Sequence, residues 1–203
     1  MPPDWSVNVS GGRAAPETAE VKDLAAADDR ALVEACLAGR REAFDAIVHR
    51  HQRQVYQVCF RFVGNHEEAS DLAQDVFVRA YRGLRGFRGQ SAIATWLYRI
   101  AVNVSLNRVG TKTPRFEPLD RVERADARME RADSAVLRRE RAGQVRAAIA
   151  RLPKKQRATL ILRVYHELPH DQIAAILGSS VGAVKANFFH ALANLKKLLE
   201  GRP

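Results

Sequence analysis

The sequence predicts an all-α protein made of two small helical modules joined by a flexible linker, with a helix-turn-helix as the C-terminal module. Apolar residues recur every three or four positions over residues 30–109 and again over 139–203, which is the period of an α-helix. Between them, residues 110–138 contain Pro114 and Pro118, few large apolar groups, and closely mixed acids and bases. Such a segment cannot bury a core and is expected to act as a tether.

Composition narrows the class of protein. The 203-residue chain has a formal net charge of +10, and residues 138–203 hold thirteen Lys and Arg against four acidic residues. This balance favours a polyanionic partner, although a solvated basic face would give the same count. Cys36 and Cys59 stand far apart and the six histidines lack ligand spacing, so no disulfide scaffold, metal site or other cofactor is expected. Without a long apolar run or a signal-peptide pattern, the chain is expected to avoid membrane insertion and to be cytoplasmic.

The N-terminal part begins with a predicted mobile, acidic tail over residues 1–29, which is rich in Pro, Gly and Ala. Helical periodicity starts near residue 30, and Gly39 and Gly64-Asn65 are the expected helix stops. The apolar positions that carry this period are Leu32, Cys36, Phe44, Ile47, Val48, Val55, Val58, Cys59 and Phe62. With the two elements that follow, they predict a bundle of about four helices over residues 30–109.

The next predicted helix covers residues 71–84 and has two distinct faces. Leu72, Val76, Ala80 and Leu84 recur every fourth residue and predict a buried stripe. On another face lie Asp71, Gln74 and Asp75. Like charges four residues apart cost a helix a few tenths of a kcal/mol, a cost that a basic partner would recover.

A loop over residues 85–91 leads to a further helix that starts near Ile93. Ser91 is the expected N-cap of this helix. Its predicted buried face consists of Ile93, Trp96, Leu97, Ile100 and Val104, and its open face of Thr95, Arg99, Asn103, Asn107 and Arg108. Trp96 fits either a core anchor or a platform for stacking a base, and the anchor is favoured.

The C-terminal module, residues 139–203, reads as three or more helices separated by clear breaks. Pro153 is expected as the first residue of one helix, and Pro169 ends that run. Gly178 then closes a short helix and Ser179-Ser180 offers the next N-cap, which is the pattern of a helix-turn-helix. In the long last helix, which starts at Val181, we expect Phe188 and Leu192 to face the core, while the side of Phe189 stays open.

Three blocks of the first module together resemble a known family. Asp71–Phe77 (DLAQDVF), Phe87–Ser91 (FRGQS) and Thr95–Asn103 (TWLYRIAVN) are similar in order and spacing to the second conserved region of extracytoplasmic-function (ECF) sigma factors. The last module, with Leu152–Arg157 (LPKKQR) upstream of its helix-turn-helix, resembles their fourth region. The resemblance covers most of the chain.

This resemblance implies a function and its binding residues. The chain would bind core RNA polymerase, at the clamp of the largest subunit and at the flap region, and direct promoter recognition, promoter melting and transcription initiation. An anti-sigma factor is a further implied partner, and promoter DNA would be bound both as duplex and as melted strand. Core polymerase would contact Asp71, Gln74, Asp75 and Val78. The minus-ten element would contact Phe87, Arg88, Gln90, Ser91, Arg99, Asn103 and Asn107. The minus-thirty-five element would contact Ser179, Ser180, Lys185, Asn187 and His190.

Two other functions fit parts of the sequence. A dimeric helix-turn-helix transcriptional regulator would explain the C-terminal module, but it has no reason to contain the block from Asp71 to Asn103. A metal-dependent nuclease would use Asp71, Asp75 and His66, but these lie in one short helical stretch without a second acidic cluster. We therefore expect a sigma factor and no enzymatic activity.

Overall fold

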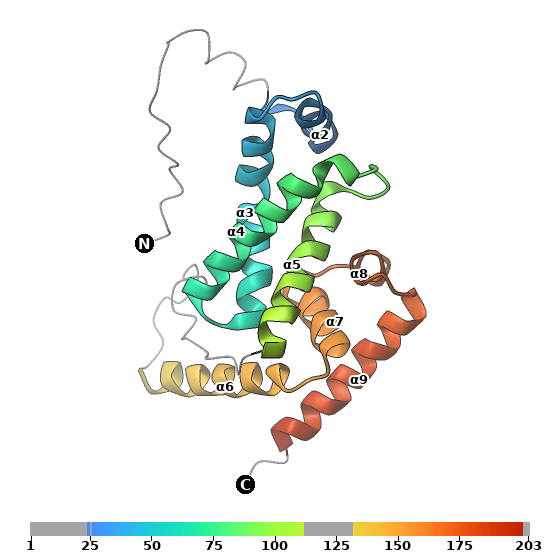
Figure 1. Ribbon diagram of the computed structural model, residues 1–203. Helices are drawn as coiled ribbons and strands as arrows, with labels where there is room; N and C mark the ends of the chain where they lie inside the picture. The colour runs from blue at the N-terminus through green and yellow to red at the C-terminus, as the bar shows by residue number, and fades with distance from the viewer. Residues whose placement is uncertain (1–23, 25, 112–131, 201–203) are drawn as a thin grey trace. The chain divides into compact units, whose positions relative to one another are not determined.

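The computed structural model describes residues 24, 26–111 and 132–200, and every regular element in these ranges is a helix (Figure 1). The all-α prediction is therefore confirmed. The helices are α2 (Asp29–Leu37), α3 (Glu42–Val63), α4 (His66–Gly83), the short 3-10 helix η1 (Leu84–Gly86), α5 (Ile93–Thr111), α6 (Ala132–Ala150), α7 (Lys154–Tyr165), α8 (His170–Leu177) and α9 (Val181–Glu200). The predicted tail over residues 1–29 and the predicted linker over 110–138 fall mostly outside the described residues.

The chain divides into two compact units, residues 1–47 and 48–203, and α3 runs across the boundary. In the first unit, α2 begins where the Asp28 carboxylate accepts a hydrogen bond from the Ala31 amide at 2.7 Å. Leu32 is completely buried. The helix ends before Gly39, whose φ of +98° favours glycine, as the sequence predicted.

In the second unit, α3, α4 and α5 share an apolar core. The stripe predicted on α4 is confirmed, because Leu72, Val76, Ala80 and Leu84 are all at most 4% exposed. These side chains belong to one core with buried residues of α3 and α5, of which Phe62 and Leu97 are among the largest. Burying a side chain of this size stabilises the fold by roughly 1.5–3 kcal/mol.

The turns around α4 follow from capping chemistry. Gly64 has a φ of +71°, and the Asn65 side chain accepts a hydrogen bond from the Glu68 amide at 2.8 Å, so α3 ends at the predicted stop. Helix α4 begins at His66, which is earlier than the stretch over residues 71–84 that the sequence predicted as helical. At the start of α5 the expected cap is wrong by one residue. The Ala92 carbonyl accepts the first helical hydrogen bond, from Trp96, so Ser91 lies just before the N-cap.

The helices α7, α8 and α9 form the expected helix-turn-helix. Gly178 closes α8 in the left-handed conformation, with φ 58° and ψ 44°. The Ser180 hydroxyl then accepts a hydrogen bond from the Ala183 amide at 3.2 Å and caps α9, as expected. Pro153 is not the first residue of α7. Its ψ of 143° is extended, and it precedes the helix as the N-cap.

Candidate polymerase and promoter interfaces

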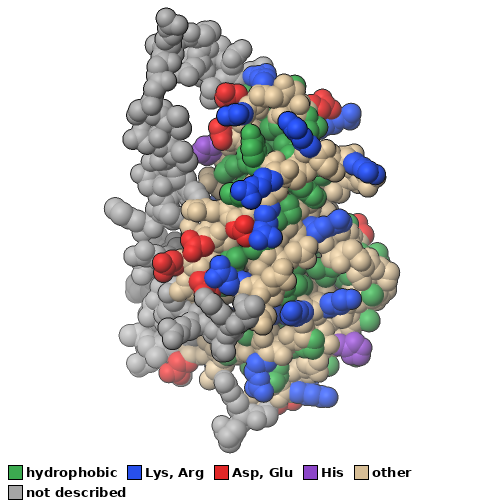
Figure 2. Space-filling view, viewed as in Figure 1, with side chains coloured by type: hydrophobic (Ala, Val, Ile, Leu, Met, Phe, Trp, Pro, Cys, Tyr) green, Lys and Arg blue, Asp and Glu red, His purple; other side chains and the backbone are tan. Residues whose placement is uncertain are grey.

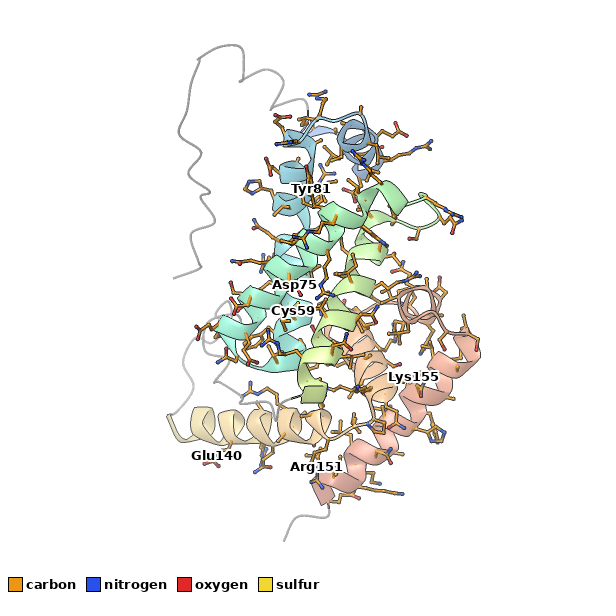
Figure 3. All side chains as sticks on the ribbon, in the orientation of Figure 1. Cys59, Asp75, Tyr81, Glu140, Arg151 and Lys155 are labelled. Atoms are coloured by element: carbon orange, nitrogen blue, oxygen red, sulfur yellow. The ribbon has the colours of Figure 1, made fainter. Side chains whose placement is uncertain are left out.

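The predicted polymerase-binding residues share the outer face of α4. Asp71, Gln74 and Val78 are exposed, and the Asp75 side chain is 40% exposed. Figure 3 labels Asp75 and Tyr81. Because residues three, four and seven positions apart lie on one side of a helix, these four side chains form one continuous surface. We call Asp71, Gln74, Asp75 and Val78 the α4 face.

A basic partner for the α4 face comes from α4 itself. The Arg79 guanidinium pairs with the Asp75 carboxylate at 3.0 Å, and this hydrogen bond raises the pKa of Arg79. Both side chains are exposed, so the pair adds only a few tenths of a kcal/mol. Arg79 thus offsets part of the repulsion between Asp71 and Asp75 while leaving both carboxylates accessible.

Tyr81 extends the α4 face and was missed in the sequence. Its side chain is 49% exposed, next to Val78 at 46%. The signal was present in the sequence, since Tyr81 stands three residues after Val78 and therefore lies on the same side of the helix. Aromatic residues beside an exposed apolar side chain are typical of the centre of protein interfaces.

The predicted minus-ten residues lie on the loop after η1 and on α5. Most of them are exposed, namely Arg88, Gln90, Arg99, Asn103 and Asn107, while Phe87 and Ser91 are half-buried. The Phe87 ring packs against Trp96 with centroids 5.2 Å apart. Trp96 is half-buried and also lies close to Gly83, where an added Cβ would come within 3.4 Å of the indole ring. Trp96 therefore anchors the loop to the end of α4, which is the favoured interpretation from the sequence.

The Arg99 side chain forms a hydrogen bond with another helix of the same chain. Its guanidinium donates a hydrogen bond to the Ala175 carbonyl of α8 at 2.5 Å. The preceding residue, Tyr98, meets the edge of the His166 ring, with centroids 5.6 Å apart. These contacts join α5 to the helix-turn-helix, a juxtaposition that the sequence did not predict.

The nuclease alternative gains no support from the surroundings of His66. Its ring stacks on Phe60 at 4.5 Å, and its Nδ1 lies 2.5 Å from the Tyr56 hydroxyl. Among the described residues, no group of three His, Cys, Asp or Glu side chains is placed to hold a metal ion.

The predicted minus-thirty-five residues lie at the start of α9 and in the turn before it. Ser180, Lys185 and His190 are exposed, and Ser179 and Asn187 are half-buried. The basic residues of α9 are Lys185, Lys196 and Lys197. Figure 2 shows Lys and Arg side chains spread over the visible face of the molecule, with apolar side chains between them. Because the Ser180 hydroxyl caps α9, its remaining lone pair and proton are what a ligand could use.

Three large apolar side chains on α9 show which side of the helix is buried. Phe188 is half-buried and meets the edge of the His170 ring, in agreement with its predicted core-facing side. The prediction for Leu192 is wrong, since its side chain is 45% exposed. The buried side of α9 centres on Val184 and Ala191, and Leu192 falls to one edge of it. Phe189, left open by the sequence, is 70% exposed.

His166 predicts a pH dependence of stability. Burial, with the nearby Arg61 cation, lowers the pKa of His166 to about 4 from an ordinary 6.5. The unfolded chain therefore binds a proton more readily than the folded one between these values, so stability is lost as the pH falls from about 6.5 towards 4. We expect His166→Gln to remove about 2 kcal/mol of the difference in unfolding free energy between pH 7.5 and pH 5, measured by urea denaturation. His49→Gln, at an exposed position, is the control, and an equal effect of both variants would contradict the prediction.

Comparison with known proteins identifies the family of the chain. The family models of Sigma-70 region 2 and Sigma-70, region 4 match residues 47–114 and 142–195. The RNA polymerase sigma-H factor of Pseudomonas aeruginosa is 36% identical over 182 residues, which cover 85% of this chain and 94% of that relative. The ECF sigma factor SigW of Bacillus subtilis is 33% identical and covers 79% of this chain and 91% of its own. The chain belongs to the ECF sigma factors of RNA polymerase.

The fold of this sigma factor has a close counterpart among solved structures. CnrH, solved in complex with the cytosolic domain of CnrY, superimposes with a TM-score of 0.63 at 25% identity and covers 86% of this chain and 99% of its own. Sigma factors are transcription initiation factors that bind polymerase and DNA and catalyse no reaction, so the prediction of no enzymatic activity is confirmed. Within the described residues, no helix is both long and apolar enough to cross a membrane.

Lys185 and Asn187 on α9 are expected to contribute to DNA binding in different ways. Lys185→Ala should weaken binding to any duplex and reduce the salt dependence by about one phosphate contact, because a lysine acts on phosphate as a point charge. Asn187→Ala should relax the preference at one base pair, since an amide can pair with adenine in the major groove. Holoenzyme binding to specific and random duplexes at several salt concentrations measures both effects. Equal losses on the two duplexes for both variants would contradict this division.

Proposed function

We propose that this ECF sigma factor docks on the clamp of the largest polymerase subunit through the α4 face and reads promoter DNA with two separate surfaces. The loop and α5 would hold the melted minus-ten strand, and the start of α9 would lie in the major groove of the minus-thirty-five element. The chain would thus bring core polymerase to its promoters and help to open them, in the cytoplasm where polymerase works.

The observation that carries this proposal is the outer surface of α4. It presents two carboxylates, an amide and two large apolar groups, Val78 and Tyr81, on a helix whose other side is fully packed. A folded helix gains nothing from exposing such a combination to water, whereas a basic and apolar partner surface would bury it. The minus-ten residues lie on a different helix, α5, so polymerase and DNA can be bound at the same time.

A regulatory partner is also part of the proposal. CnrH is solved with the cytosolic domain of CnrY, so a structural relative is known to bind a second protein. An anti-sigma factor that covers the α4 face would keep this chain from polymerase.

Cosedimentation tests the proposal against the regulator alternative. With core polymerase, the chain should sediment in a one-to-one complex, and alone it should sediment as a monomer. A stable dimer that ignores core polymerase would instead support the helix-turn-helix regulator, and the α4 face would then be a dimer surface.

A further inference from the structure

Charged residues divide α4 and the segment after it into two parts of opposite sign. All four acids of the helix, Glu67, Glu68, Asp71 and Asp75, lie before residue 76. From residue 76 to residue 116 the chain contains no acidic residue and eight basic ones. The α4 face and the residues that follow it are therefore suited to partners of opposite charge.

Three exposed arginines follow the α4 face at intervals of three residues. Arg82 lies in the last turn of α4, Arg85 in the 3-10 helix η1, and Arg88 in the loop after it. Gly83 and Leu84 keep helical backbone angles, so α4 continues into η1 without a break. Because residues three apart are eclipsed in a 3-10 helix and neighbours in an α-helix, Arg82 and Arg85 lie on the same side. We call Arg82, Arg85 and Arg88 the arginine strip.

Helix capping and internal ion pairs do not explain the arginine strip. A cation in the last turn of a helix interacts favourably with the macrodipole, which accounts for Arg82 but not for Arg88, beyond both helices. Within the described part of the chain, none of the three guanidinium groups has a carboxylate partner, whereas Arg79 is paired with Asp75. Like charges three residues apart on a helix repel each other, and an anionic partner would offset this repulsion.

The partner of the arginine strip differs from the partner of the α4 face. A polymerase surface complementary to Asp71 and Asp75 is basic, and it would repel arginines. The strip instead ends beside Phe87, whose ring packs against Trp96 and belongs to the predicted minus-ten surface. Guanidinium groups bind phosphate through two parallel hydrogen bonds, and contacts to phosphate do not depend on base sequence. Charge and position therefore both favour a nucleic-acid backbone.

We propose that the arginine strip binds the phosphodiester backbone of the melted promoter strand, next to the bases held by the loop and α5. The inference rests on the proposed function, because that function places the melted strand at this loop. Arg82 and Arg85 supply charge without reading sequence, and the neighbouring amides of Gln90 and Asn103 distinguish bases. Because a single strand releases counterions when its phosphates are neutralised, the strip makes binding of the melted strand sensitive to salt.

The salt dependence of binding to a melted template measures this contact. The holoenzyme, which is this chain reconstituted with core polymerase, is bound to a duplex that carries a mismatched bubble of arbitrary sequence. Each phosphate contact contributes about 0.7 to the slope of log affinity against log salt for a single strand, so the double variant Arg82→Ala, Arg85→Ala should lower the slope by about 1.4. On the fully paired duplex of the same sequence, the slope should not change. Arg53→Ala, at an exposed arginine on α3, is the matched control and should behave as wild type on both templates.

Neutral linkages in the DNA locate the phosphates that the strip contacts. Each phosphate of the two bubble strands is replaced in turn by a methylphosphonate, which keeps the linkage and removes its negative charge. At a few adjacent positions of one strand, the replacement should weaken binding of the wild-type holoenzyme about threefold and should have no further effect on the double variant. Equal losses for wild type and the double variant at every position would overturn the proposal.

Further variants and binding measurements separate the strip from folding and from polymerase docking. Arg82→Lys with Arg85→Lys keeps both charges and should retain the wild-type salt slope, and a slope as low as that of the alanine variant would contradict a role for charge. Circular dichroism monitors the helices of each variant. If the alanine variant loses affinity for core polymerase, the strip belongs to the polymerase surface and the proposal is wrong. If the wild-type chain does not bind core polymerase, the proposed function is wrong, and salt dependence measured with the free chain and bubble DNA still decides whether the strip binds a melted strand.

Discussion

Asp75→Arg is expected to reduce the affinity of the sigma factor for core polymerase by at least a hundredfold while leaving the fold intact. Reversing a charge at the centre of an interface places like charges together, which costs several kcal/mol. In the free chain the cost is small, because the side chain is 40% exposed and its only described partner is the exposed Arg79. Exposed substitutions usually change stability by less than about 0.5 kcal/mol.

Competition against wild type for core polymerase measures this loss, and circular dichroism monitors the fold. Glu140→Arg on α6 makes the same reversal at an exposed acid away from the α4 face and serves as the control (Figure 3). Unchanged affinity for Asp75→Arg, with an unchanged spectrum, would show that polymerase docks elsewhere.

Asn103→Ala and Gln90→Ala are each expected to lower open-complex formation about tenfold without lowering core binding. Holding a base outside the stack costs a few kcal/mol, which must be recovered by hydrogen bonds and stacking in the protein. Both amides are exposed and lie on the same segment as Phe87, whose ring is held in place by Trp96. Losing one amide removes a polar contact worth about 1–3 kcal/mol.

A fluorescent base analogue in the minus-ten strand reports this unstacking. Gln54→Ala, an exposed amide on α3, is the matched control and should open promoters at the wild-type rate. If Asn103→Ala and Gln90→Ala also open them at the wild-type rate and extent, the segment from Phe87 to Asn103 is not the reading surface.

The local spacing of apolar residues and glycines in the sequence predicted most of the helices and their buried sides. The stripe on α4 and the breaks at Gly64 and Gly178 could be read directly, because burial repeats with the helical period and positive φ favours glycine. Leu192 shows where such patterns mislead. It continues the apolar spacing of α9 but falls beside the strip that α7 and α8 cover, so it stays exposed.

The contact between the modules could not be predicted from the sequence. The bond from Arg99 to Ala175 joins residues 76 apart, and the bond from Arg157 to Phe62 joins residues 95 apart. Both acceptors are backbone carbonyls, which every residue carries, so the sequence holds no signal for the pairing. For Arg99 the exposed helical position suggested DNA alone, and the second partner emerged only from the fold.

Selection of DNA from a random pool tests the central claim most directly. Core polymerase reconstituted with this chain should enrich DNA with two short elements at a constant spacing, one of them within the segment that melts. Neither core polymerase alone nor the free chain should enrich that pair. Enrichment of a single palindrome by the free chain, with no added effect of core polymerase, would contradict the account and indicate a dimeric regulator.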